Sequence, residues 1–287
     1  MPTLPSSPLG FAHLLSHMLD AVAATGQMKR FPVDVSEIAL QVSAQFAWTD
    51  PIIEVKAAPI PGFEGGLFPV AKSGWLLLYN DRTKSVGRVR FTQAHELGHY
   101  LLHRKMQESF SCTERDMVEW GPDSKKIESE ADAFASALLM PLNHFRALVN
   151  DDRIDFAMLG SCAELFGVSL TAAALRWVSF TDESAVMVLA RDGFMDWSVS
   201  SDKARANGAF FKTRSSVIEL PPGSLAADAI DSSVKDGQII PASTWFKHAD
   251  PGARLREMKI ACTNHGYSLS LLHLSRGDKV WPPWDRS

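Results

Sequence analysis

The chain has 287 residues, 46% of them hydrophobic, which is enough for about two domains with ordinary cores. Its formal net charge of −4 excludes a general electrostatic attraction to nucleic acid, and no run approaches the ~20 apolar residues of a membrane-spanning helix. The first residues carry no secretory pattern and the three cysteines, Cys112, Cys162 and Cys262, are far apart, so we expect a cytoplasmic protein with reduced thiols.

The first part of the chain predicts two helices and three strands. Apolar residues recur at helical spacing between Leu9 and Ala24, and a second helix follows Asp34, where Glu37 completes a capping-box signature. Short strands are predicted over Ile52 to Val55, Gly65 to Val70 and Trp75 to Tyr79. We therefore predict a small α+β domain with a short antiparallel sheet packed on the next helix. An exposed strand there would suit pairing with an extended peptide.

The next helix carries a metal-binding pattern, His95-Glu96-Leu97-Gly98-His99. Histidines four residues apart share one helix face and can bind a single Zn²⁺, with the intervening glutamate beside the metal. Zinc lowers the pKa of a bound water, and Glu96 can take its proton and later donate it to a leaving amine. From these five residues alone, a helix with two unrelated histidines is an equal alternative.

Such a zinc site needs a third protein ligand. The following helix opens with Glu128-Ser129-Glu130-Ala131-Asp132, continues as an apolar stripe and ends at Pro141. Glu128 and Asp132 lie one turn apart, which suits one carboxylate as a ligand and the other as a partner that orients an imidazole. Glu130 points roughly 160° away from Glu128, so only one of them can face the metal. We prefer Glu128; a solvated acidic first turn is the alternative.

Together the two motif helices are more specific than either alone. Arg90-Phe91-Thr92, the run from His95 to His103, the run from Glu128 to Ala135, and Leu138-Leu139-Met140-Pro141 closely resemble the ImmA/IrrE family of zinc metallopeptidases. The resemblance implies a zincin-like regulatory endopeptidase. Such an enzyme cleaves a helix-turn-helix transcriptional repressor and so releases a stress-response or mobile-element programme.

The resemblance also assigns individual residues. His95 and His99 match the family's histidine ligands, Glu96 its catalytic glutamate and Glu128 its downstream ligand, with Zn²⁺ as the only cofactor. Asp132 stands four residues after that ligand, where the family has Asp or Asn. His103 matches a recurrent histidine one turn beyond the ligands, so both are candidates for orienting them. A solvated histidine at the helix end is an equal alternative for His103.

Residues 151–181 read as two helices with a tight turn at Gly167 and a cap at Ser169. The family resemblance includes a helix-turn-helix segment at this place. However, the second helix, Leu170 to Trp177, carries a single basic residue, whereas a recognition helix offers several side chains to phosphates and bases. We therefore expect a helical support or a docking surface for a partner, and no direct DNA binding.

The last third of the chain changes to short alternating runs. Strands are predicted over Val186 to Ala190, Phe194 to Val199, Ser216 to Leu220, Leu255 to Cys262 and Tyr267 to His273. The resemblance implies a sensor-like domain, similar to GAF, at this end, on the basis of position alone. The predicted organisation is a zinc metallopeptidase domain over 1–150, a helix-turn-helix-like segment over 151–181 and a C-terminal α+β domain over 182–287.

The sequence thus predicts a zinc-dependent regulatory endopeptidase whose partner is a helix-turn-helix repressor. The alternative is a DNA- or protein-binding regulator with a metal site that is not catalytic. Intact Glu96 counts against this alternative, because a purely structural zinc needs no base beside it. No pattern in the sequence indicates the oligomeric state.

Overall fold

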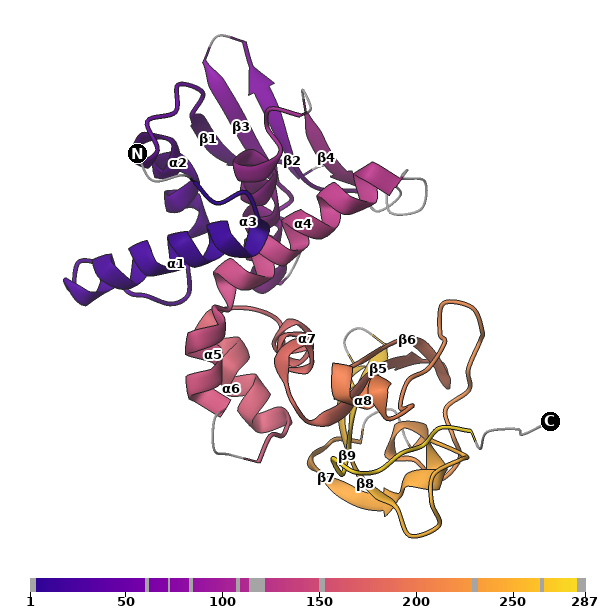
Figure 1. The fold of residues 1–287 in the computed structure, drawn as a ribbon. Helices are drawn as coiled ribbons and strands as arrows, with labels where there is room; N and C mark the ends of the chain where they lie inside the picture. Colours follow the sequence, from indigo (N-terminus) through magenta and orange to yellow (C-terminus); the bar gives the residue numbers. More distant parts are fainter. Residues whose placement is uncertain are drawn as a thin grey trace. The chain divides into compact units, whose positions relative to one another are not determined.

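The structure, a computed structural model, describes residues 4–59, 62–71, 73–82, 85–106, 109–113, 122–149, 153–228, 232–263 and 266–282. The chain divides into two units, Met1–Asn150 with Cys162–Ser169, and Asp151–Ser161 with Leu170–Ser287. The described residues form eight α-helices and two sheets, with helices and a sheet in each unit (Figure 1). The predicted α+β class is therefore confirmed.

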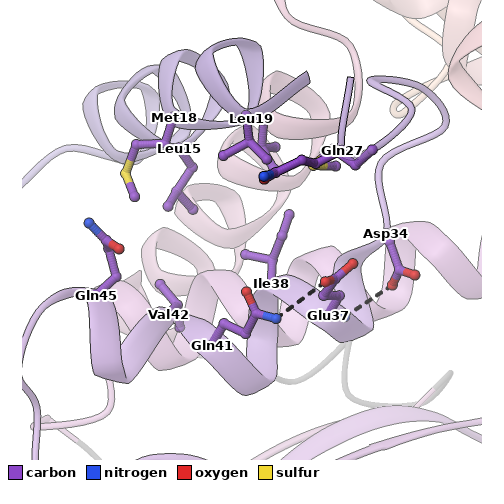
Figure 2. Close-up of a pocket in the computed structure, with 12 residues that line it drawn as sticks. Leu15, Met18, Leu19, Gln27, Asp34, Glu37, Ile38, Gln41, Val42 and Gln45 are labelled. Carbon is purple, nitrogen blue, oxygen red and sulfur yellow. Dashed lines mark hydrogen bonds between the residues drawn. The ribbon is translucent and has the colours of Figure 1, made fainter. Parts of the chain in front are cut away.

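Helices α1 (Pro8–Ala24) and α2 (Val35–Gln45) begin at side-chain caps. Ser7 Oγ accepts a hydrogen bond from Gly10 N, and Asp34 Oδ1 accepts one from Glu37 N. The Glu37 carboxylate bonds to Gln41 Nε2, 3.2 Å away. A cavity of about 360 Å³ lies between the two helices, with polar side chains at its rim (Figure 2). Its apolar lining is Leu15, Met18, Leu19, Val22, Met28, Ile38 and Val42.

The sheet of the first unit is mixed. It contains β1 (Ile52–Ala57), β2 (Phe63–Val70), β3 (Gly74–Tyr79) and β4 (Phe110–Thr113), in the order β1-β3-β2-β4. Antiparallel pairs join β2 to β3 and to β4, but β1 pairs with β3 in parallel. The predicted all-antiparallel sheet is wrong at this pair, because the hairpin of β2 and β3 inserts β3 between β1 and β2.

The position of β3 also decides where a peptide can pair. Because β3 has a neighbour on each side, the strand Trp75 to Tyr79 has no free edge. Among the described residues, β4 pairs with β2 alone. The edge available beside the motif helices is therefore that of β4.

Two helices carry the motifs, α3 (Val86–Leu102) and α4 (Pro122–Leu139), and α4 lies along α3 (Figure 1). Gly98 permits this close approach, because a Cβ atom there would lie 3.0 Å from Phe134 Cδ1 and 3.3 Å from Ala131 Cα. Ala131 and Phe134, which meet Gly98 there, are both fully buried. The helix pair therefore fixes the relative positions of the side chains on its two facing sides.

After α5 (Leu142–Val149), the chain enters α6 (Phe156–Phe166) and α7 (Leu170–Phe180), which are bent by 108°. Gly167 has φ of 64° at the turn, and its carbonyl accepts a hydrogen bond from the Arg90 guanidinium. Within the first unit, Phe166 stacks on Phe145 with ring centroids 5.5 Å apart. No single described helix is long and apolar enough to cross a membrane; the bent pair meets that requirement only when both helices are counted together.

The second unit is built on an antiparallel sheet in the order β6-β5-β9-β8-β7. Its strands are β5 (Ser184–Arg191), β6 (Phe194–Ser200), β7 (Val234–Pro241), β8 (Arg254–Cys262) and β9 (Tyr267–Leu274). The predicted strand Ser216 to Leu220 is wrong, since that segment contributes a single bridge from Glu219 to Phe194. The fifth strand is instead β7, which was not predicted and which pairs with the predicted strand β8.

One face of this second sheet is covered by short elements, α8 (Asp202–Ala206) and two 3-10 turns, Leu225–Ala227 and Ala242–Thr244. Trp245 and Phe246 are buried in the core there. Of the cysteine side chains that the structure describes, Cys162 is buried and Cys262 half-buried, and both are free thiols. The side chain of Cys112 lies outside the described part. The GAF-like character of this unit stays a prediction.

Candidate metal centre

Helices α3 and α4 bring the three predicted metal ligands, His95, His99 and Glu128, together. His95 Nε2 lies 2.9 Å from Glu128 Oε2, and His99 Nε2 lies 3.0 Å from His95 Nε2. His99 Nε2 is also 3.4 Å from Glu128 Oε1. Among the described residues, these side chains are the one group of three whose ligand atoms all lie within 4.8 Å of one another. Two imidazoles and a carboxylate are a donor set that fits a divalent metal with a fourth position open.

The protonation states of the group also suit a metal. His99 is fully buried, and burial lowers its pKa to about 4 although a hydrogen bond with Glu128 opposes the shift. Burial alone would raise the pKa of Glu128, but hydrogen bonds with His95 and His99 outweigh it and hold the pKa at about 2. Near neutral pH, His99 is therefore neutral and Glu128 ionised, as metal binding requires.

Asp132 holds the first histidine. Its Oδ1 atom lies 2.9 Å from His95 Nδ1. A carboxylate can only accept, so a neutral His95 that offers the lone pair of Nε2 to a metal would carry its proton on Nδ1 and donate it to Asp132. Asp132 is thus placed to orient His95 if that histidine binds a metal, which stays a prediction.

His103 and Glu130 hold the second histidine. His103 is buried, its Nδ1 lies 3.2 Å from His99 Nδ1, and its Nε2 lies 3.0 Å from Glu130 Oε2. Because Glu130 accepts from His103 Nε2, the Nδ1 atom of His103 is left to accept from His99 Nδ1. This tautomer would leave the lone pair of His99 Nε2 for a metal held between His99 and Glu128. We call His99, His103 and Glu130 the histidine relay.

Glu130 therefore contacts His103 and stays outside the group of three ligand atoms, a contact that was not predicted from the sequence. A signal was present, because His103 follows His99 at the same four-residue spacing as His99 follows His95. That spacing places all three rings on one helix face. The third ring, His103, therefore pointed to a carboxylate partner on α4.

Glu96 is fully buried on the side of α3 that faces β2. A Cβ atom at Gly65 would lie 3.0 Å from Glu96 Oε1 and 2.4 Å from Thr92 Cγ2, so the backbone of β2 passes directly over these side chains. Glu96 follows the ligand His95 in the chain and stands between α3 and the sheet. Its carboxylate is thereby held against a strand instead of projecting into solvent.

Phe110 connects the sheet edge to the metal group. Its ring stacks on His99, with centroids 4.5 Å apart and planes inclined by 17°, and lies 6.2 Å from the ring of His103. Phe110 is the first residue of β4. The edge strand therefore begins against a ligand histidine.

Comparison with known proteins gives a family match and distant similarities to solved structures. Residues 49–178 match the model of the Peptidase M78 family, described as the IrrE N-terminal-like domain. A solved structure described as a Mycobacterium tuberculosis transcriptional regulator is similar with a TM-score of 0.49 and 14% identity, over 91% of this chain and 77% of that chain. No curated protein matches the sequence.

Proposed function

We propose that the chain is a zinc-dependent regulatory endopeptidase, in line with the match of residues 49–178 to the IrrE N-terminal-like domain. The observation that carries the proposal is the meeting of His95, His99 and Glu128 from two helices, with Glu96 one residue after the first ligand. The substrate we propose is a helix-turn-helix transcriptional repressor in the cytoplasm. Its cleavage would release a stress-response or mobile-element programme.

The residues divide the chemistry between them. His95, His99 and Glu128 would hold Zn²⁺, and Asp132 and His103 would orient the two imidazoles. Bound zinc would polarise the scissile carbonyl and acidify a water molecule. Glu96 would take the proton of that water and then deliver it to the departing amide nitrogen. Burial of Glu96 against β2 keeps its carboxylate in one position between these two transfers.

We propose that the substrate pairs in an extended form with the edge of β4 that no other described strand occupies. Phe110 places the beginning of this strand against His99, and an added strand would receive backbone hydrogen bonds there. The strand Trp75 to Tyr79 cannot pair with a substrate in this way, because it has a neighbouring strand on each side. Contacts far from the metal, by α6, α7 and the second unit, would hold one partner and exclude others.

A regulator that binds DNA with a non-catalytic metal site is the second candidate. The 108° bend between α6 and α7 is the observation that favours it. Against it, Arg176 is the single basic residue of α7. A helix that reads DNA usually carries several such side chains.

One experiment separates the two candidates. The full-length chain would be incubated with a helix-turn-helix repressor encoded next to its gene, and cleavage and zinc content would be measured. Glu96→Gln removes the base without changing size, so cleavage should fall at least ~10²-fold while zinc content is unchanged. The matched control is Glu54→Gln, on the exposed side of β1. Normal cleavage by Glu96→Gln would refute the enzyme; metal binding without any cleavage would favour the regulator.

A further inference from the structure

A second pair of histidines has nearly the same geometry as the pair in the metal centre. His13 and His17 stand four residues apart in α1, with 3.0 Å between their Nε2 atoms. Their ring centroids are 4.2 Å apart and their planes are inclined by 83°. The corresponding values for His95 and His99 are 3.0 Å, 4.7 Å and 76°.

The separation of the two nitrogens matches what a single metal ion requires. Zn²⁺ binds imidazole nitrogen at about 2.0–2.1 Å, so two such ligands in tetrahedral geometry lie roughly 3.3 Å apart. Imidazole suits zinc, nickel and copper, the borderline divalent ions, more than calcium or magnesium, which prefer oxygen. The two imidazoles therefore favour borderline divalent ions over calcium and magnesium.

The backbone beneath the pair is fixed by packing. Phe11 and Leu15 bury the opposite face of α1, and Ser7 caps its first turn. Both histidines are exposed, so their side chains are open to ions in solution. Binding would therefore cost only the side-chain freedom of two residues, since the helix already holds their Cα atoms one turn apart.

Asp20, the next polar residue on this side of α1, already has two partners. Asp20 Oδ1 lies 2.9 Å from His144 Nε2 and also pairs with Arg30 Nε. Within the described part of the chain, only His95, His99 and Glu128 make a group of three ligand atoms. The pair on α1 thus has two protein ligands and leaves the remaining positions to water, so it should bind more weakly than the metal centre.

We propose that His13 and His17 form a second metal site, on the surface of α1, for a borderline divalent ion such as Zn²⁺ or Ni²⁺. The site is open, is built by one helix turn, and takes no part in holding the metal of α3 and α4. Whether His13 and His17 bind a metal therefore does not depend on peptidase activity.

Isothermal titration of Zn²⁺, and separately of Ni²⁺, into the untagged, metal-free full-length chain tests the site. We expect a stronger event at the metal centre and a weaker second event. His13→Gln and His17→Gln should each abolish the weaker event and keep the stronger one. Glutamine is a good helix former, and unchanged thermal melting would show that α1 is intact.

Two controls complete the design. His248→Gln changes an exposed histidine in the second unit that has no histidine four residues away, and it should leave both events unchanged. Glu128→Gln should weaken only the stronger event. A weaker event that persists in both α1 variants, or its absence from the unmodified chain with both ions, would overturn the proposal. Loss of the stronger event alone from the unmodified chain would count against the peptidase proposal instead.

Discussion

The Nε2 atom of His103 lies 3.0 Å from Oε2 of Glu130, and this contact ends the histidine relay that starts at His99. The other ligand histidine, His95, is held directly by Asp132. In the candidate metal centre, His95 thus contacts a carboxylate directly, whereas His99 is linked to a carboxylate through a second histidine. Asp132, which contacts His95, has a side chain that is 61% exposed, whereas His103, which lies between His99 and Glu130, is buried.

The relay predicts a loss of metal affinity when it is broken. His103→Leu removes the acceptor for His99 Nδ1, and Glu130→Gln removes the carboxylate that fixes the tautomer of His103. Partners of this kind typically contribute 10–100-fold to metal affinity, so we expect about that loss for His103→Leu and a smaller one for Glu130→Gln. Competition between the protein and a chromophoric zinc chelator measures both.

A double-mutant cycle tests whether the two residues act in series. With His103→Leu in place, Glu130→Gln should cause no further loss, because Glu130 acts only through His103. Asp132→Asn, which acts on the other imidazole, should instead add its full effect to that of His103→Leu. Additive losses for His103 and Glu130 would mean that the relay does not operate.

Acid should destabilise the metal-free protein in a defined range of pH. The pKa of His99 is lowered from 6.5 to about 4 in the folded state, so between these values the unfolded chain binds a proton that the native chain does not. The free energy of unfolding therefore falls as pH falls from about 6.5 to 4, by at most about 1.4 kcal/mol per pH unit for this group. Glu128, lowered from 4.5 to about 2, acts with the same sign between those two values.

Urea unfolding at a series of pH values measures this effect. His99→Gln lowers stability at every pH, but it should remove the part of the slope between pH 6.5 and 4. His248→Gln, at an exposed histidine, is the control and should keep the slope. If His99→Gln leaves the slope unchanged, the acid sensitivity comes from other groups.

The meeting of His95, His99 and Glu128 was predictable from sequence because it depends on two local periodicities. Four-residue spacing aligns His95 with His99 on one helix and Glu128 with Asp132 on the other. The contact of Glu130 with His103 was not predictable in the same way, since it depends on how α3 and α4 are rotated against each other. That rotation is set by the packing at Gly98, a tertiary feature.

The order and number of the strands were likewise only partly predictable from the sequence. Apolar runs predicted β2 and β3, but the insertion of β3 beside β1 is a non-local choice. In the second unit, β7 contains Gly237 and ends at Pro241, both poor strand residues, so its pattern was missed. The segment Ser216 to Leu220 has the alternation of a strand, yet two prolines follow it and it forms a single bridge.

The second unit offers a test of a buried carboxylate. Glu257 is fully buried; Trp245 Nε1 donates to its Oε2 at 2.9 Å and Ala226 N donates to its Oε1 at 2.7 Å. Trp245→Phe removes one of these donors and should lower the free energy of unfolding by about 1–3 kcal/mol. Trp281→Phe, at a residue that is 46% exposed, is the matched control and should cost less. Equal effects in thermal or urea unfolding would contradict this role for Trp245.

Gly98 should be essential for the metal centre although it carries no side chain. A Cβ atom there would lie 3.0 Å from Phe134 Cδ1 and 3.3 and 3.4 Å from the Cα and O atoms of Ala131, and the backbone of α4 cannot move aside easily. Gly98→Ala should therefore push α4 away from α3, and overpacking of this kind costs about 1–3 kcal/mol. Because Glu128 moves with α4, zinc affinity should fall together with stability.

The matched control is Gly160→Ala in α6, where no atom lies within 4 Å of the added Cβ. This variant should be more stable by about 0.8–1.0 kcal/mol, the usual gain for Gly to Ala inside a helix, with unchanged zinc affinity. Phe134→Leu added to Gly98→Ala should restore zinc affinity only in part, because it relieves the ring contact and leaves the contact with the Ala131 backbone. Normal zinc affinity in Gly98→Ala itself would show that the approach of α3 and α4 at this point does not position Glu128.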